Sequence, residues 1–147
     1  MFKKAIVCVD GSEASLKAVE AAKEFFERGV FEKITLVSVV SPSSEAFMPS
    51  WDIDRKRSLV DQEKEEKTEY AKKVIDQALA IMGKSDKIGT YIDTGFPGDV
   101  IITYAIKNDY DCILVGNRGF GGLKRMFLGS VSTQLVQTAQ CPVIVIK

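Results

Sequence analysis

The residues whose types and spacing point most clearly to a chemical role form a glycine-rich segment in the last third of the chain. Gly116-Asn117-Arg118-Gly119 is separated by nine residues from Gly129-Ser130. An apolar run, 111–115, precedes the first glycine, and a pattern typical of a helix begins at Ser130. The first N–H groups of a helix lack intrahelical partners and carry a partial positive charge, so a glycine-rich turn there can wrap a phosphate. The segment therefore predicts an anion site between a strand and a helix.

The two best-known phosphate motifs do not fit this segment. A P-loop requires lysine and then serine or threonine after its second glycine, whereas Gly121 is followed by Gly122 and Leu123. A dinucleotide fingerprint requires a third glycine where this chain has Lys124, and it follows the first strand of its fold instead of the fourth. Residue identity thus excludes both motifs.

Composition removes several other functional classes. The 147 residues are 46% hydrophobic and 27% charged, which suits a single domain over 1–147. Basic and acidic residues number 20 each, so no net field attracts nucleic acid or an anionic membrane, and neither is expected as a partner. The chain has no histidine, which removes the commonest general base and Ser-His-Asp triads. We therefore assign no catalytic residue.

The three cysteines and the apolar runs bear on location. Cys8, Cys112 and Cys141 lie far apart without C-x-x-C spacing, which predicts reduced core thiols. No apolar run approaches the roughly 18 residues of a membrane span, and the N-terminal run is short and ends in an acid. These features favour a cytoplasmic protein that is neither secreted nor membrane-spanning.

The elements that must position the glycine-rich segment alternate between strands and helices. Ala5 to Val9 is a continuous apolar run, typical of a strand buried on both faces of a parallel sheet. Ser12 is placed to cap the following helix, Gly29 to end it, and Pro97 to begin a later one. Strands are expected at 5–9, 33–40, 87–93, 111–115 and 143–146, and helices at 12–29, 55–83, 97–108 and 130–140. An α/β domain with a mainly parallel sheet follows, with 41–54 as an irregular loop.

The pattern G-x-x-G, nine residues, then G-S resembles the nucleotide loop of the universal stress protein family. The resemblance extends to Val7 through Ser12, to Gly95-Phe96-Pro97 and to the ending 141–146. It implies an open five-stranded parallel sheet in the order 3-2-1-4-5, with helices on both faces in a Rossmann-like, adenine nucleotide alpha hydrolase-like fold. It also implies a homodimer and membership of the subgroup that binds ATP.

The resemblance assigns roles to individual residues. Asp10 matches the family acid near ribose and metal, and a carboxylate can accept ribose hydroxyls or help to hold magnesium beside phosphates. Val39 matches the apolar residue beneath adenine. Glycines bring the backbone close to the ligand, and the start of the last helix offers donors. The expected nucleotide-binding residues are Asp10, Gly11, Ser12, Val39, Gly116, Asn117, Arg118, Gly119, Gly129, Ser130, Val131 and Ser132.

The expected function is that of an ATP-binding stress-response module that uses ATP, or ADP or AMP, with magnesium. One alternative is a slow magnesium-dependent ATPase, and another is a dimeric scaffold that does not use nucleotide. A fourth and weak reading is a phosphoacceptor domain. It is suggested by Asp10, Asp93 and Lys147, which end the first, third and fifth strands.

For several features the sequence leaves both a structural and a functional interpretation open. Asp10-Gly11-Ser12 by itself is only a turn and helix cap. Lys124 and Arg125 either contact phosphate or form a solvated tip, and Gly95-Phe96-Pro97 is a structural turn or also lines the crevice. Met48 and Trp51 are expected to pack within their loop, with adenine stacking or contact with a partner as the alternative. The apolar run Val143 to Ile146 is expected to pair with the same strand of a second copy, because an edge strand exposes unpaired backbone groups.

Overall fold

The computed structural model describes residues 2–42, 51–117 and 128–147, in which five strands and four helices alternate. The strands are β1 (Phe2–Cys8), β2 (Phe31–Val40), β3 (Ile88–Thr94), β4 (Cys112–Gly116) and β5 (Val143–Ile146). The helices are α1 (Glu13–Glu27), α2 (Ile53–Met82), α3 (Pro97–Lys107) and α4 (Ser130–Thr138). The order of elements expected from hydrophobic periodicity is confirmed.

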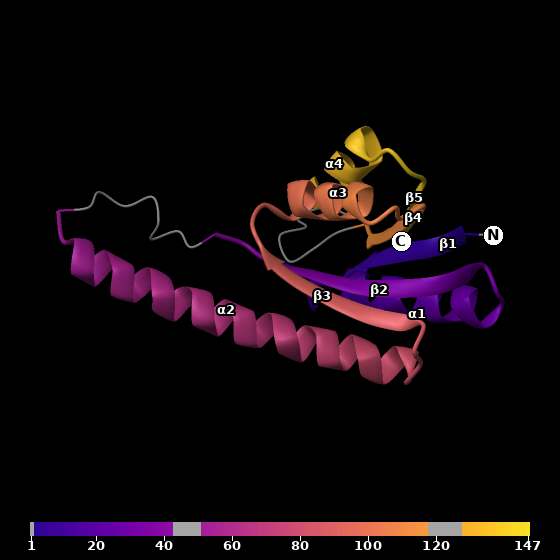
Figure 1. Ribbon diagram of the computed structural model, residues 1–147, viewed down its shortest axis with the longest axis horizontal. Helices are drawn as coiled ribbons and strands as arrows, with labels where there is room; N and C mark the ends of the chain where they lie inside the picture. The colour runs from indigo at the N-terminus through magenta and orange to yellow at the C-terminus, as the bar shows by residue number, and fades with distance from the viewer. Residues whose placement is uncertain (1, 43–50, 118–127) are drawn as a thin grey trace.

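The sheet is parallel throughout and has the order β3-β2-β1-β4-β5, which confirms the expected topology. α1 and α2 cover one face, and α3 and α4 cover the other (Figure 1). The chain leaves β1 toward β2 on one side and reaches β4 on the other, so β1 and β4 flank the point where strand order reverses. Ligands of open α/β sheets bind at the carboxyl ends of strands at such a point.

Two hydrophobic layers hold the sheet between its helices. Along β1, Ala5 and Val7 join the layer beneath α1 and α2, while Ile6 and Cys8 join the layer beneath α3 and α4. Successive side chains of a strand point to opposite faces, so a strand covered on both faces must be apolar at every position. This is the physical reason for the continuous apolar run in β1.

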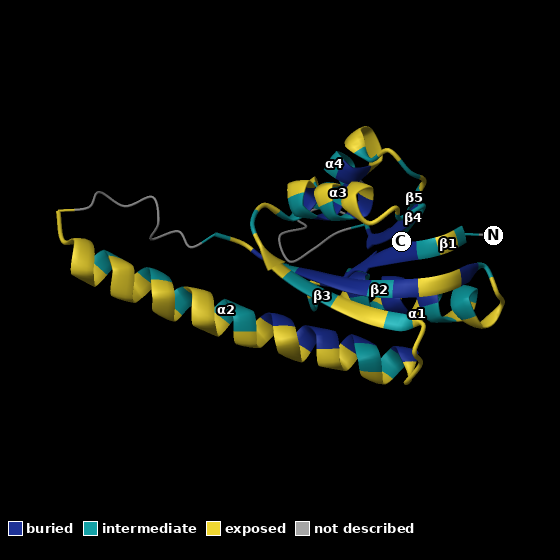
Figure 2. Ribbon diagram, in the orientation of Figure 1, coloured by how far each residue is buried: buried dark blue, intermediate teal, exposed yellow. Residues whose placement is uncertain are grey.

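The long helix α2 packs along only part of its length. Its second half buries Ala71, Val74, Ile75 and Ala78, whereas residues 53–70 are exposed or half-buried as the helix extends past the sheet (Figure 2). α2 begins two residues before the expected start at 55, because the Asp52 side chain accepts a hydrogen bond from the Arg55 N–H at 3.1 Å.

The expectation that Trp51 packs within its loop is wrong, since Trp51 is 92% exposed. Met48 lies outside the described residues.

Three other boundaries carry the signals that the sequence predicts. Ser12 caps α1, Gly29 follows the end of α1 with φ +75°, and Pro97 is the first residue of α3. β1 starts three residues earlier than expected, because the Asp111 carboxylate accepts the N–H groups of Lys3 and Lys4 at 2.9 and 3.0 Å and extends the strand. Among the described helices, none combines the length and apolarity needed to cross a membrane.

Candidate functional site

The residues expected to bind nucleotide come together at one edge of the sheet. Asp10 to Ser12 follow β1, Val39 lies near the end of β2, Gly116 ends β4, and residues 129–132 begin α4. Because all strands run parallel, their carboxyl ends share this edge. Arg118, Gly119, Lys124 and Arg125 lie outside the described residues, so their expected roles stay predictions.

The turn after β1 is held in place from within. One carboxylate oxygen of Asp10 accepts the Ser12 N–H at 2.8 Å, and the Ser12 hydroxyl accepts the Ser15 N–H at 3.2 Å. Asp10 itself is exposed, which leaves its carboxylate accessible to a ligand. Ser12 is buried and acts as the helix cap, so its side chain has a structural task in this turn.

Two features require glycine at position 11: its backbone conformation and the close packing of α2. Its φ is +84°, a region that favours glycine. A Cβ at this position would lie 2.5 Å from the Tyr70 hydroxyl and 2.8 Å from a methyl group of Val74. Tyr70 also donates to the Asp10 carbonyl at 3.4 Å. α2 therefore packs against the Asp10 turn through Tyr70. Nothing in the sequence around Tyr70 predicts this contact.

The two ends of the glycine-rich loop are joined at its base. The Gly129 N–H donates to the Asn117 carbonyl at 2.6 Å, and the Ser132 hydroxyl reaches the carbonyls of Asn117 and Gly129 at 3.2 and 2.9 Å. The Asn117 N–H donates to the Ile146 carbonyl at 2.8 Å. These bonds fix the start of α4 beside the end of β4, and they use the Ser132 side chain for that purpose.

Gly116 allows a close approach between β4 and α1. A Cβ at this position would lie 2.6 Å from the backbone carbon and oxygen of Ala14. Backbone atoms cannot rotate away as a side chain can, so only glycine fits without a shift of α1. The first turn of α1 is thereby held against the end of β4.

α4 opens toward the same edge without a side-chain cap. Gly129 is its N-cap residue, and the first hydrogen bond of the helix runs from the Thr133 N–H to the Gly129 carbonyl at 2.9 Å. The N–H groups of Ser130, Val131 and Ser132 precede that bond and are the donors that a helix start presents to an anion. Ser130 is exposed, so solvent and ligands reach this turn.

Val39 and Asp93 form the third part of this edge. They are register partners on β2 and β3, and Val39 packs against the layer beneath α3 and α4. Asp93 accepts hydrogen bonds from the Tyr91 hydroxyl at 2.7 Å and the Thr94 N–H at 2.8 Å. Phe96, in the turn that leads to α3, is 61% exposed.

The thiols offer no nucleophile at this edge. Burial, and then the nearby Asp10 charge, raise the pKa of Cys8 far above its ordinary value, and burial raises the pKa of Cys112 to about 12. All three cysteines are free, as expected, and both Cys8 and Cys112 are buried. Within the described ranges no group of three or more acidic or cysteine side chains is arranged to hold a metal ion.

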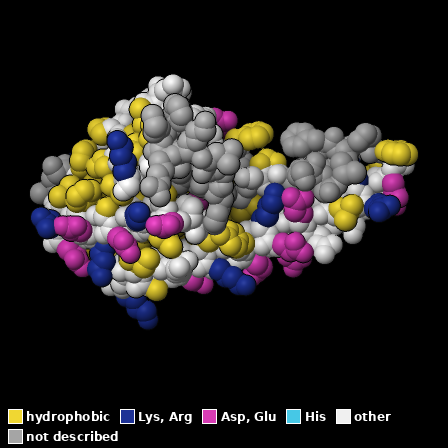
Figure 3. Space-filling view, turned by 180° about the vertical axis from the view of Figure 1, so that it is seen from behind, with side chains coloured by type: hydrophobic (Ala, Val, Ile, Leu, Met, Phe, Trp, Pro, Cys, Tyr) yellow, Lys and Arg dark blue, Asp and Glu magenta, His cyan; other side chains and the backbone are white. Residues whose placement is uncertain are grey.

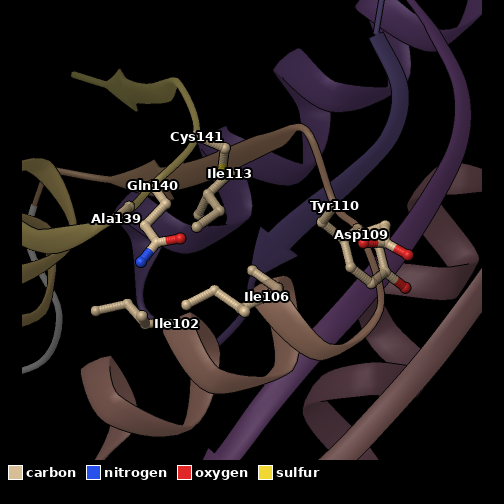
Figure 4. A pocket seen from close by; sticks show the side chains of 9 residues that line it. Ile102, Ile106, Asp109, Tyr110, Ile113, Ala139, Gln140 and Cys141 are labelled. Atoms are coloured by element: carbon tan, nitrogen blue, oxygen red, sulfur yellow. The ribbon is translucent and has the colours of Figure 1, made fainter.

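A separate pocket of about 260 Å³ lies at the opposite ends of β4 and β5. Figure 4 shows Ile102 and Ile106 of α3 on one side of it and Ile113, Gln140 and Cys141 on the other. Its lining includes none of the residues expected to bind nucleotide. The pocket is therefore not part of the crevice at the carboxyl ends of the strands.

Charges are mixed on the molecular surface. On the face shown in Figure 3, basic and acidic side chains lie intermixed among the described residues. α1 carries paired charges of this kind, such as Glu13 with Lys17 at 3.4 Å and Glu24 with Arg28 at 2.6 Å. This surface matches the equal numbers of acidic and basic residues in the sequence.

Comparison with known proteins identifies relatives of the whole chain. A family model described as "Universal stress protein family" matches residues 1–147. The universal stress protein YxiE of Bacillus subtilis is 31% identical over 154 residues, with all of both chains covered. The solved universal stress protein UspA from Lactobacillus plantarum has a TM-score of 0.80 at 26% identity and covers 99% of this chain and 97% of its own. An Arabidopsis thaliana family member solved with AMP bound has a TM-score of 0.63 at 25% identity, with 99% and 91% covered.

Proposed function

Because the chain belongs to the universal stress protein family, we propose that it binds ATP, or ADP or AMP, and acts as a nucleotide-dependent regulatory module in the stress response. The observation that carries the proposal is the start of α4, which has no side-chain cap and is held beside the end of β4, the strand end against which Ala14 of α1 packs. The AMP complex of the Arabidopsis relative supports an adenine nucleotide as the ligand.

Each part of the edge has chemistry suited to one part of the nucleotide. Val39 supplies apolar area for the base. Asp10 supplies a carboxylate that can accept hydrogen bonds from the ribose hydroxyls. The first N–H groups of α4, at Ser130 and Val131, suit the phosphates because they are fixed donors at the positive end of a helix dipole.

Magnesium fits this proposal as an ion shared between protein and ligand. Asp10 is the residue that would hold the ion, and the phosphate oxygens of the nucleotide would be its other ligands. The ion would neutralise phosphate charge beside the carboxylate.

The direct test is calorimetric titration of the protein with ATP and magnesium, after removal of any nucleotide carried through purification. Gly129→Val adds a branched side chain where the phosphates approach α4, and we expect it to weaken ATP binding at least tenfold. Thr138→Val, at the other end of α4, removes a hydroxyl that donates to the Gln134 carbonyl and should leave ATP affinity unchanged. ATP affinity in folded Gly129→Val equal to that of the unaltered protein would refute the assignment.

We also propose that bound nucleotide is sensed rather than consumed. The chain has no histidine, and we assign no residue as a base that would position water. Phosphate release from ATP and magnesium should remain at background. Robust turnover that is lost in Asp10→Ala would instead establish the ATPase alternative.

A homodimer through β5 is part of the same proposal. β5 is an edge strand, and its four residues, Val143 to Ile146, are apolar and only half-buried. Pairing with β5 of a second copy would satisfy the exposed backbone groups and cover these side chains. Size-exclusion chromatography with light scattering should give twice the chain mass at micromolar concentration, and a monomer mass would refute the pairing.

A further inference from the structure

Asp93 lies one strand away from the residue assigned to the base. It is the register partner of Val39, and neighbouring strands of a sheet are about 4.8 Å apart. Tyr91, two residues earlier on β3, packs with Val39 against the layer beneath α3 and α4. Side chains two residues apart on a strand share a face, so Asp93 is on the same side of the sheet as Val39.

The carboxylate is held in a fixed orientation by an aromatic stack. The Tyr91 hydroxyl donates to one oxygen of Asp93 at 2.7 Å, and the Thr94 N–H donates to the other at 2.8 Å. The Tyr91 ring stacks on Tyr104 of α3, with centroids 3.9 Å apart and planes inclined by 11°.

The stack continues to a third ring. The ring centroids of Tyr110 and Tyr104 are 5.4 Å apart, and the Tyr110 hydroxyl is hydrogen-bonded to the Thr35 hydroxyl at 2.6 Å. The donor that orients Asp93 is therefore fixed by rings from β3, α3 and the segment that leads into β4.

The Asp93 side chain is also available to a ligand in its charged form. It is exposed at the end of β3. The Tyr91 hydrogen bond, then the Thr94 N–H, and more weakly the Lys107 charge, hold the pKa of Asp93 below its usual value. An ionised carboxylate only accepts hydrogen bonds and has room for about four donors, and the residues that the structure describes supply these two.

We propose that Asp93 determines base specificity by accepting a hydrogen bond from the exocyclic amino group of adenine. The inference rests on the nucleotide site proposed above, with the base over Val39. Guanine and hypoxanthine carry an oxygen where adenine carries that amino group, so the carboxylate would face another acceptor. A carboxylate that faces a carbonyl oxygen at this position loses its hydrogen bond, and sites built around a hydrogen bond reject analogues that lack it.

The experiment compares ATP with inosine triphosphate, titrated separately in the presence of magnesium. The two ligands differ at the purine 6-position and at the proton on the adjacent ring nitrogen. We expect the unaltered protein to prefer ATP by about tenfold or more, in line with the discrimination given by a hydrogen bond to a charged group. Asp93→Ala should reduce the preference to less than about threefold. Asp93→Asn should tighten binding of inosine triphosphate, because the amide can donate to its oxygen.

A matched control separates specificity from charge. Asp99 is another exposed acid, six residues further along at the start of α3. Asp99→Ala removes the same charge close to the same edge, so it should change the affinity for both nucleotides by the same factor. Tyr91→Phe keeps the ring stack but removes the orienting hydroxyl, and it should lower the ATP preference by about twofold to fivefold.

The outcomes distinguish this inference from the proposed function. If the unaltered protein binds neither nucleotide, the nucleotide site itself is wrong and the inference falls with it. If it binds ATP, and folded Asp93→Ala retains the full preference over inosine triphosphate, the site stands and the role of Asp93 is refuted. A preference lost equally in Asp99→Ala would also refute that role.

Discussion

Replacement of Gly11 by alanine tests whether α2 supports the Asp10 turn. The variant incurs two separate costs. A non-glycine residue at φ +84° loses about 1 kcal/mol to backbone strain. The new Cβ would also lie 2.5 Å from the Tyr70 hydroxyl and 2.8 Å from Val74, and overpacking of this kind costs about 1–3 kcal/mol. We therefore expect Gly11→Ala to lower the free energy of unfolding by about 2–4 kcal/mol.

Gly29→Ala separates the two costs. Gly29 has a similar φ, +75°, but a Cβ there would have no described atom within 4 Å beyond its chain neighbours. It should lose only the backbone cost of about 1 kcal/mol. Both variants reduce the freedom of the unfolded chain equally, so that effect cancels in the comparison.

Urea denaturation followed by circular dichroism measures both values under the same conditions. Tyr70→Ala in the Gly11→Ala background should recover part of the difference, because it removes the nearer of the two contacts. Equal destabilisation by Gly11→Ala and Gly29→Ala would refute the packing of α2 against this turn.

Three further predictions concern single side chains. Ser12→Ala removes the cap of α1 and should lower the free energy of unfolding, measured by urea denaturation, by about 1 kcal/mol. Ser58→Ala, in the exposed first half of α2, should change that free energy little. Equal effects of the two variants would contradict the cap. Cys8 and Cys112 should resist iodoacetamide in the native protein at pH 8, because burial raises both pKa values and hides both thiols, while Cys141 reacts first; mass spectrometry of the labelled peptides decides this. Tyr91→Phe should raise the pKa of Asp93 in carboxyl NMR titrations. Since the folded pKa of Asp93 is lowered, its contribution to stability is present above the unfolded pKa near 3.8 and is lost as pH falls through the folded value, so Tyr91→Phe should lose less stability on acidification.

Periodicity and turn residues are sufficient to predict the elements. The continuous apolar run of β1, the Ser12 cap and Pro97 at the start of α3 each act over a few residues, so their effects can be recognised in a short stretch of sequence. The strand order needs the family resemblance, because nothing local in β1 indicates that β4 is its neighbour.

The features that the sequence does not predict depend on contacts between distant residues. Tyr70 meets Gly11 across 59 positions, and no periodic pattern marks that contact. The sequence marks Asp93 only as the end of a strand, since its orientation arises from rings on three separate segments. β1 begins earlier than its apolar run and includes Lys3 and Lys4. These lysines are part of the strand because the Asp111 carboxylate accepts hydrogen bonds from their backbone N–H groups.

The central claim is that adenine nucleotide binds at the carboxyl ends of β1, β2 and β4. Amide chemical shifts of the isotope-labelled protein, recorded while ATP and magnesium are added, test it most directly. We predict that the largest shifts occur at Asp10, Val39, Ser130 and Val131, where the turn after β1, the end of β2 and the start of α4 meet. Shifts concentrated at Ile106, Gln140 and Cys141, around the pocket at the opposite ends of the strands, or no shifts at all, would contradict the claim.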